Sequence, residues 1–570
     1  MKKFKNIFQN ENLVNILILF IAAFFICIPL LSSKIDVSYD DGIQHIARLM
    51  GTFQSLQEKQ SFPVIMSNFC NSFGYSWNLF YSPFTAFLPL IFKIFNASFI
   101  GCIKMFMFVT VFASGIAMYF FTKEVTKNKK MALISGILYI FAPYRLTDMY
   151  ARNALAELTS FIFIPMIFHG LYGIIKGKSK KEYFLIIGSI CLILTHTVVA
   201  MYVATLCFTY LLTQAKKLKI KSIRKKLIIS LLFIVAITSF FWMPLLESKN
   251  SADYEVFKPG RMERTDVLIA FKLRFFELFI TPKNNIMTYE IGWLSIILLL
   301  FTPFVIRKLR KKYINTDFYS FYIYSLIAGL VCAFMTLQIF PFEYMPSLFK
   351  MIQFSFRLLE FSSFFFSFVV AVNFGILVKK IKYKDVVFVL VILMILTCTY
   401  IPHLHYTDSL NESKLWPAIP VTSETKRVHA GCASFEYLPC KAFENRSYIE
   451  TRNDDIIVLT GNAQIENKKK NGTNLTANII NSENETLIEF PYIYYIGYSV
   501  KLKQSDEIIE LKTLETDNGF VGVILPETQN TKLAVSYKGT TIMNVTKVIS
   551  IVGIILLIIK VFLHNRKLNR

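Results

Sequence analysis

The sequence predicts an α-helical protein that crosses the membrane many times and carries one all-β domain outside it. Of its 570 residues, 54% are hydrophobic, and the mean hydropathy is +0.47. A soluble chain of this length would expose more polar surface and would divide into several domains. Apolar runs long enough to cross a hydrocarbon core of about 30 Å recur along the chain. Examples are 13–31, 228–246 and 545–563.

Positive charge is concentrated in short clusters between the apolar runs. The formal net charge is +24, and all of the excess lies in these clusters, since the rest of the chain carries a slightly negative balance. Under the positive-inside rule such clusters mark cytoplasmic segments, so nucleic-acid binding is not needed to explain the charge. The clusters occupy residues 1–12, 122–130, 176–182, 214–226, 307–313, 379–384 and 564–570.

Fixing the basic clusters in the cytoplasm predicts about twelve spans, with both termini cytoplasmic. The run 183–213 is too long for one helix, so we expect two short spans with a turn at 195–197, or a re-entrant pair. Long external segments are expected at 33–98 and 247–289. The remaining spans are predicted near 13–32, 99–121, 131–144, 156–175, 227–246, 290–306, 318–338, 356–378, 385–401 and 545–563.

Residues 402–544 differ in kind from the rest of the chain. Apolar and polar residues alternate in three stretches, 456–460, 498–502 and 532–537. Such alternation indicates half-buried strands, and many short strands bounded by turns are typical of a β-sandwich. The predicted domains are a transmembrane domain at 1–401, an extracytoplasmic β-rich domain at 402–544, and a final span with a basic cytoplasmic tail at 545–570.

Two features of the predicted external region bear on disulfides and metals. Cys432 and Cys440 stand outside the apolar runs, in a compartment that permits a disulfide between them; free thiols are the alternative. His403, His405 and Asp408 are of metal-ligand type, but their spacing matches no known metal motif. No motif supports a divalent metal, and no cofactor is predicted.

The first external segment contains polar residues at helical spacing. Asp41, His45 and Arg48 stand at i, i+4 and i+7, and Asp40 precedes them. If a helix begins near Asp41, a carboxylate, an imidazole and a guanidinium share one face just outside the membrane. The same spacing is common on solvated amphipathic helices, where it gives only an ordinary ion pair.

The motifs that follow resemble a known family, and their order carries more weight than any single motif. They are Ser61-Phe62-Pro63, Asn71-Ser72-Phe73-Gly74-Tyr75, Asn78-Leu79-Phe80-Tyr81-Ser82-Pro83, Tyr144-Arg145-Leu146 with Asp148, Tyr150, Arg152 and Glu157, and Gln353-Phe354-Ser355-Phe356-Arg357-Leu358. The chain is similar to bacterial membrane proteins described as 6-pyruvoyl-tetrahydropterin-synthase-related, which have no synthase chemistry. It is also similar to their relatives in the GT-C glycosyltransferase superfamily.

Two further points qualify the resemblance. The segment 491–498, with Gly519-Phe520 and Leu525-Pro526, resembles the extracytoplasmic end of a group implicated in lipoteichoic-acid glycosylation. The family usually has Pro-Trp where this chain has Ser355-Phe356, which questions the local turn but not Arg357. The tyrosines of 491–498 either stack on sugars or form the core of a sandwich.

The resemblance implies a GT-C-like membrane glycosyltransferase. It would move a sugar from a polyprenyl-phosphate donor to a cell-wall or lipid-linked glycan acceptor on the extracytoplasmic side, among membrane lipids. Inverting transfer needs a carboxylate to take the acceptor proton, and the lipid phosphate that leaves needs cations. Asp41 is the candidate base and Asp40 the second choice. The candidate substrate-binding residues are His45, Arg48, Asp148, Arg152, Glu157, His196 and Arg357.

Each of these roles has a structural alternative. Arg152 and Arg357 either clamp phosphate or extend to the membrane interface. Arg48 either binds phosphate or orients Asp41, and His196 is either a substrate contact or a structural histidine. Glu157 would be costly at membrane depth without a partner, so we expect it in one network with Asp148, Arg152 and the first-loop acids.

The alternative function is a flippase or transporter of lipid-linked glycans, for which about twelve spans is also typical. A scaffold whose β domain binds a partner is a third class. Transporters tend to show internal repeats and polar breaks near mid-membrane. Here we find no repeat, and the ionisable residues gather at the predicted external ends of the spans, which favours the transferase.

Overall fold

The computed structural model describes residues 10–32, 37, 40–60, 62–280, 287–383, 385–395, 432, 434–481, 483, 485–504 and 507–568. His403, His405 and Asp408 lie outside the described residues. The chain divides into two compact units. The first comprises Met1–Gly42, Ile91–Val235 and Glu263–Pro417, and the second Ile43–Leu90, Ala236–Met262 and Ala418–Arg570.

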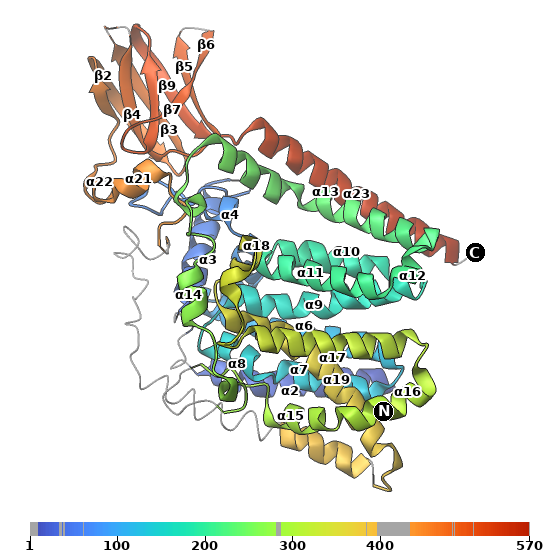
Figure 1. Cartoon of the computed structure of the whole chain (residues 1–570). Coiled ribbons are helices and arrows are strands. Elements are labelled where there is room, and N and C mark those ends of the chain that lie inside the picture. Colours follow the sequence, from blue (N-terminus) through green and yellow to red (C-terminus); the bar gives the residue numbers. More distant parts are fainter. Residues whose placement is uncertain are drawn as a thin grey trace. The chain divides into compact units, whose positions relative to one another are not determined.

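The first unit is a bundle of apolar helices (Figure 1). Two of them, α9 (Leu155–Ile175) and α19 (Leu359–Leu377), are central, because 89% and 83% of their most apolar windows are buried. A helix that is hydrophobic on every side belongs in a core. The others are α2 (Glu11–Cys27), α6 (Phe99–Thr126), α7 (Lys129–Ile140), α8 (Pro143–Tyr150), α10 (Glu182–Ile193), α11 (Thr197–Thr213), α12 (Ala215–Leu218), α14 (Thr265–Ala270), α15 (Trp293–Leu300), α16 (Thr302–Tyr313), α17 (Asp317–Met335) and α18 (Ser347–Lys350).

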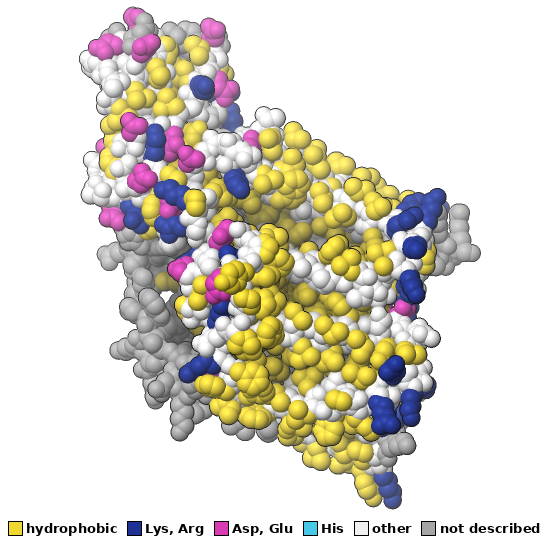
Figure 2. Space-filling model, in the orientation of Figure 1, with side chains coloured by type: hydrophobic (Ala, Val, Ile, Leu, Met, Phe, Trp, Pro, Cys, Tyr) yellow, Lys and Arg dark blue, Asp and Glu magenta, His cyan; other side chains and the backbone are white. Residues whose placement is uncertain are grey.

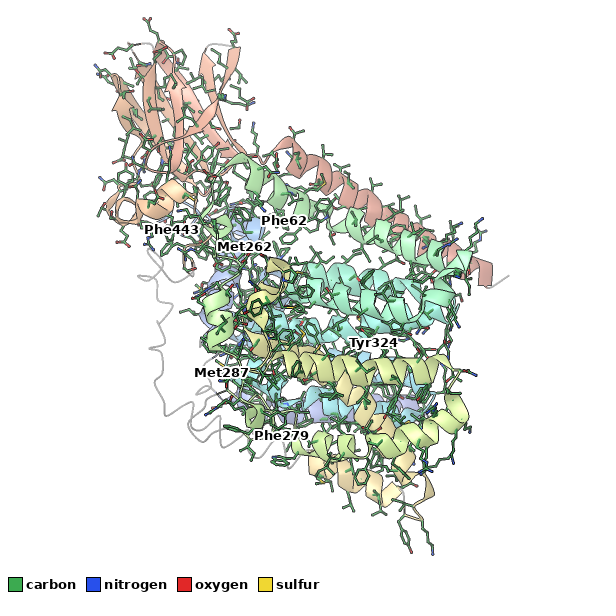
Figure 3. All side chains as sticks on the ribbon, viewed as in Figure 1. Phe62, Met262, Phe279, Met287, Tyr324 and Phe443 are labelled. Atoms are coloured by element: carbon green, nitrogen blue, oxygen red, sulfur yellow. The ribbon has the colours of Figure 1, made fainter. Side chains whose placement is uncertain are left out.

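Aromatic rings fill the space between these helices. The Phe168 ring on α9 lies 5.1 Å from Phe364 and 5.5 Å from Phe365, both on α19, measured between ring centroids. Tyr324 on α17 points into the bundle (Figure 3), where its hydroxyl donates to the carbonyl of Leu206 on α11 at 2.5 Å. Edge and face contacts between rings add to the free energy gained from burying their area. The many phenylalanines of the chain therefore serve to fill the space between these helices.

The second unit contains the β structure, as two antiparallel sheets. Their strand orders are β1-β4-β8-β7 and β2-β3-β9-β5-β6. Tyr492, Tyr495 and Tyr498 are buried in the hydrophobic core of this unit, so three of the four tyrosines of 491–498 are core residues, and Tyr494 is partly buried against that core. The strands are β1 (Ile457–Thr460), β2 (Ala463–Asn471), β3 (Asn474–Asn481), β4 (Thr486–Ile493), β5 (Tyr498–Gln504), β6 (Glu507–Leu511), β7 (Thr513–Glu515), β8 (Phe520–Leu525) and β9 (Thr528–Tyr537).

Helices complete the second unit. The C-terminal half of α13 (Lys221–Ser251) packs against α23 (Thr541–Leu568), where the hydroxyls of Ser239 and Ser550 lie 3.2 Å apart. Figure 1 shows the two helices side by side. The remaining helices are α3 (Gly42–Gln57), α4 (Trp77–Phe80), α5 (Phe84–Phe87), α21 (Cys440–Glu444) and α22 (Arg446–Thr451).

The described part of the chain contains seven helices long and apolar enough to cross a membrane. The prediction of about twelve spans also counted apolar runs that form shorter helices. The runs at 183–213 form two helices, α10 and α11, and that at 131–144 forms α7, a helix of 12 residues. At about 1.5 Å per residue such a helix is shorter than the hydrocarbon core. The predicted span at 290–306 is likewise divided between α15 and α16, so an apolar run does not fix the length of its helix.

Candidate functional site

Arg152 is the centre of an ionic cluster in the first unit. It lies just after α8, and its Nη1 donates to Asp148 Oδ1 at 2.7 Å, Glu157 Oε2 at 2.8 Å and the Tyr144 hydroxyl at 3.1 Å. The Tyr144 hydroxyl donates in turn to Glu157 Oε2 at 2.7 Å. Asp148 is one helical turn before Arg152, and Glu157 is in the first turn of α9. The segment from α8 to the first turn of α9 therefore supplies all four of these side chains.

Arg357, which is 200 residues after Glu157 in the chain, contacts the same carboxylate. Its Nε donates to Glu157 Oε1 at 2.6 Å, and its Nη1 donates to Gln353 Oε1 at 2.8 Å. Glu157 thus holds one arginine on each oxygen. All three of these charged side chains are at least nine-tenths buried, so the pairing offsets a large desolvation cost.

Aromatic faces cover both guanidiniums. Arg152 lies 5.2 Å from the centre of the Phe356 ring, and Arg357 lies 5.0 Å from that of Phe354. Phe356 belongs to the Ser355-Phe356 pair that replaces the usual Pro-Trp, and Phe354 precedes that pair. Residues Ser355–Leu358 form a short 3-10 helix, and the Ser355 hydroxyl donates to the carbonyl of Phe271 at 2.8 Å. The pair that departs from the family pattern therefore places an aromatic ring against Arg152.

Asp40 and Asp41 lie at the exposed side of this cluster. Asp41 Oδ2 is 3.5 Å from Arg152 Nη2, and Asp40 Oδ2 is 3.9 Å from Arg152 Nε. Their side chains are 44% and 46% exposed, whereas that of Arg152 is 2% exposed. The arrangement is a pair of accessible carboxylates beside a buried cation, which suits a base that must meet a substrate and keep its charge.

Backbone geometry fixes the two aspartates. The Asp41 amide donates to the Arg152 carbonyl at 3.1 Å. Asp40 and Asn153 both adopt the left-handed region, with φ of 46° and 49°, and so does Gln353 with φ of 66°. Such residues are sparse outside glycine and are typical of functional sites.

Gly42 is required by this turn. A Cβ there would lie 1.9 Å from the Val37 carbonyl oxygen and 2.9 Å from the Asn153 Cβ. We expect Gly42→Ala to displace Asp41 and to lower activity at least tenfold, with the protein still folded. The measurement is the transfer rate together with the unfolding temperature. A fully active Gly42→Ala variant would show that the position of Asp41 is unimportant.

The environment changes the proton affinity of several groups. Partial burial, and secondly the charge of Asp41, raises the pKa of Asp40 to about 6. Burial, and secondly the charge of Glu157, raises the pKa of Asp148 well above its usual range. Burial opposes the charge of Arg152, but Glu157 and its other acidic neighbours raise the pKa of Arg152 on balance. Burial and the charge of Glu157 thus favour the neutral form of Asp148, and the acids around Arg152 favour its charged form.

The raised pKa of Asp40 predicts a pH dependence. Above about pH 6 Asp40 carries a negative charge beside Arg152, and a more negative site assists removal of the acceptor proton, so the sugar transfer implied by the resemblance is expected to become faster as the pH rises past about 6. Asp40→Asn should remove this limb of the pH–rate profile. The effect of this proton on stability has the opposite sign. The folded state holds the Asp40 proton more tightly than the unfolded state does, so the free energy of unfolding falls as the pH rises from the usual pKa of 3.8 to about 6. A profile unchanged by Asp40→Asn would contradict the assignment.

The other predicted site residues are placed differently. His196 precedes α11 in the first unit, and its Nδ1 accepts from the Val199 amide at 3.3 Å, as an N-cap does. Burial, and secondly the charge of Arg357, lowers the pKa of His196 to about 3, so it is neutral. Its structural role as a cap is established, whereas contact with substrate remains a prediction.

His45 and Arg48 belong to the second unit, on α3, a helix that begins at Gly42 as predicted. Arg48 is 1% exposed and donates to Asn78 Oδ1 at 3.3 Å and to the Ser82 carbonyl at 3.1 Å. Its guanidinium also lies 4.4 Å from the centre of the Tyr81 ring. The hydrogen bonds of Arg48 thus organise the Asn78–Pro83 motif, a role that the sequence did not suggest.

Three members of the cluster carried no predicted role. Tyr144 and Gln353 are members of the quoted motifs, and hydrogen bonds to Glu157 and Arg357 define what they do. Glu360 is buried and accepts from the Ser160 hydroxyl. A glutamate two positions inside an apolar run is itself a signal, because burial of an acid requires a partner. Among the described residues, no group of three or more His, Cys, Asp or Glu side chains is arranged to hold a metal.

The fold and this cluster define an integral membrane protein with an ionic site at the ends of its helices. A family model described as "6-pyruvoyl-tetrahydropterin synthase related domain; membrane protein" matches residues 79–407. This is more than half of the chain, so the chain belongs to that family. An uncharacterized protein of Lactococcus lactis subsp. cremoris (strain MG1363) is 25% identical over 311 residues, which cover 52% of this chain and 49% of that protein. The chain thus matches about half the length of this curated relative.

Solved structures of an oligosaccharyltransferase from Archaeoglobus fulgidus are also similar. The archaeal oligosaccharyltransferase AglB in complex with an inhibitory peptide and a dolichol-phosphate gives a TM-score of 0.46 at 10% identity, covering 71% of this chain and 56% of that chain. The oligosaccharyltransferase complex with Zn and sulfate gives a TM-score of 0.44 at 12% identity, covering 70% and 53%. These values are too low to transfer an activity.

Proposed function

We propose that this protein is a membrane glycosyltransferase of the GT-C type, which transfers a sugar from a polyprenyl-phosphate donor to a cell-envelope glycan on the extracytoplasmic side. The observation that carries the proposal is the pair of half-exposed carboxylates, Asp40 and Asp41, beside a buried arginine. The ordered motifs of the GT-C-like family also support it. The likeness of 491–498 to a lipoteichoic-acid glycosylating group supports a teichoic-acid type of acceptor.

The proposed reaction is a displacement at the anomeric carbon. The acceptor hydroxyl attacks this carbon, and Asp41 takes its proton. The bond from the carbon to the phosphate oxygen breaks, and the electron pair stays on the lipid phosphate. A positioned carboxylate contributes about 10²- to 10⁴-fold to such a step.

Arg357 is suited to meet the charge that develops on the phosphate. Its Nε and Nη1 are occupied by Glu157, Gln353 and the Ile352 carbonyl. Among the described residues, no hydrogen bond is made by its Nη2. A buried, prealigned cation of this kind costs no reorganisation when charge moves to the leaving oxygen. Arg152, which faces the aspartates, would hold the base in place.

Reconstituted protein tests the proposal against transport. Purified protein in liposomes is given a panel of polyprenyl-phosphate sugars with a labelled sugar, together with teichoic-acid and lipid-linked glycan acceptors. Transfer of label to an acceptor supports the proposal. Movement of labelled lipid-linked glycan across the bilayer, with no covalent transfer of its sugar, would instead establish the transporter function.

A further inference from the structure

A large basic cavity lies in the first unit, apart from the ionic cluster. It has a volume of about 1270 Å³ and is surrounded by the ends of α6, α9, α16 and α19 and the starts of α7 and α17. Figure 2 shows the Lys and Arg side chains gathered at these helix ends, on the right of the view. Seven lysines line it: Lys127, Lys130, Lys176, Lys217, Lys308, Lys312 and Lys379.

The cavity has few acids to balance these lysines. Asp317 and Asp385 are its only lining carboxylates among the described residues. Asp317 pairs with Lys217, and Asp385 pairs with Lys130. Lys127 pairs with Glu124, which is not a lining residue, at 2.7 Å. Four lysines make no ion pair with a described residue: Lys176, Lys308, Lys312 and Lys379.

Part of the cavity wall is apolar. Leu309, Phe318, Phe374 and Phe388 contribute to it, and Leu309 and Phe374 are buried. A volume above about 1,000 Å³ exceeds that of a usual small-molecule pocket. A wall that combines several cations with apolar side chains matches an amphiphile with an anionic head.

We propose that this cavity binds the phosphate head of an anionic amphiphile, with its hydrocarbon chain against the apolar wall. Basic pockets between spans are typical binding sites for such lipid heads. Lysines at helix C-termini also stabilise the helix dipole, which would explain their charge but not the cavity between them. The phosphate could be supplied by a membrane lipid or by a soluble phosphate compound, and the test separates the two.

The test compares two triple variants of the full-length protein in neutral detergent. Lys308→Gln/Lys312→Gln/Lys379→Gln removes three unpaired cavity lysines. Lys219→Gln/Lys221→Gln/Lys225→Gln removes the same charge from exposed lysines outside the cavity. Native mass spectrometry counts bound lipid, and unfolding temperature is measured with phosphatidylglycerol, cardiolipin or phosphatidylcholine, and with inorganic pyrophosphate.

We expect wild type and the control triple to retain anionic lipid and to gain several degrees in unfolding temperature with it, but not with phosphatidylcholine. The cavity triple should lose at least tenfold in anionic-lipid binding, and the corresponding Lys→Arg triple should restore it. A rise with pyrophosphate that equals the rise with lipid would assign the site to soluble phosphate. Equal loss of binding in the two Gln triples, or no loss in either, would overturn the proposal. None of these outcomes depends on transferase activity.

A second inference comes from a pair of cysteines in the second unit. Cys70 and Cys432 are 362 positions apart, yet their Sγ atoms lie 3.2 Å apart and both residues are buried. The sequence had suggested Cys440 as the partner of Cys432, but the structure gives Cys432 this other neighbour. The Tyr75 hydroxyl fixes the approach: it donates to the Cys432 carbonyl at 3.2 Å and accepts from the Tyr437 amide at 3.0 Å.

We infer that Cys70 and Cys432 form a disulfide, an inference that rests on the extracytoplasmic location included in the proposed function. The oxidant is a disulfide-bearing protein or small molecule. One cysteine thiolate attacks the oxidant's disulfide to give a mixed disulfide and releases one thiolate. The second cysteine thiolate then displaces the other half of the oxidant. The protein loses two thiol protons and two electrons, and the oxidant gains the electrons.

Peptide mapping of protein from native membranes tests the disulfide. Free thiols are alkylated in denaturant, and the digest is analysed without reduction. We expect a linked peptide that contains both cysteines, lost in Cys70→Ser and in Cys432→Ser but kept in Cys440→Ser. The two single variants and the double variant should lower the unfolding temperature equally, because each removes the same bond. Recovery of both cysteines fully alkylated would overturn the inference, whatever the transfer assay shows.

Discussion

Asp41→Asn is expected to lower the rate of sugar transfer by about 1,000-fold, because it removes the base that takes the acceptor proton. Asn keeps the size of the side chain and the turn that the Asp41 amide makes with the Arg152 carbonyl. The loss should therefore appear in kcat with an unchanged unfolding temperature. Initial rates on a labelled donor measure it.

Asp40→Asn is the matched control for that experiment. It removes an equally exposed carboxylate from the neighbouring position, 3.9 Å from the same arginine. We expect it to keep at least a tenth of the wild-type rate. If Asp40→Asn is the inactive variant and Asp41→Asn is active, the two roles are exchanged. Wild-type rates in both variants would remove both residues from the chemistry.

Glu157→Gln is expected to reduce stability by about 3–5 kcal/mol, the usual cost of breaking a buried ion pair. Glu157 is 2% exposed and holds Arg152 and Arg357 at 2.8 and 2.6 Å, so its neutralisation leaves two buried cations without their shared partner. Thermal or denaturant unfolding in detergent measures the change.

The control for Glu157→Gln is Glu444→Gln. Glu444 is an exposed acid 3.3 Å from Lys258, which is itself exposed and also pairs with Glu255, so its neutralisation should leave the unfolding temperature unchanged. Equal effects of the two substitutions would mean that the buried cluster does not contribute specially to stability. A folded Glu157→Gln protein should still be inactive, because Arg152 and Arg357 would no longer be aligned.

The part of the cluster formed by residues close together in the sequence could be predicted from that sequence. Asp148 and Arg152 are four residues apart in the sequence, and Glu157 at the start of an apolar run needs a partner, so their network was predictable. The contacts of Arg152 with Asp148, Glu157 and Asp41 confirm it. The alternation of 456–460 and 532–537 likewise located the β structure, because a period of two residues is specific to strands.

Other parts depend on contacts that no local pattern contains. Arg48 was expected beside Asp41 because both fit one helical face, but its hydrogen bonds to Asn78 and Ser82 depend on how the later motif folds back. The approach of Cys70 to Cys432 joins segments 362 residues apart. The helices of 131–144 and 183–213 are shorter than an ideal span, since helix ends depend on capping and packing, whereas hydropathy reports only apolar length.

The sharing of Glu157 between two arginines has a consequence for the donor under the proposed function. A lipid phosphate that approaches Arg357 adds negative charge to a cluster in which Asp40 already holds its proton up to about pH 6. Binding should therefore draw a proton from solution onto the acids, and donor affinity should fall as the pH rises. Calorimetric titration in buffers of different ionisation enthalpy would count that proton, and the pH of the cell envelope would then act on loading of the donor as well as on the chemical step.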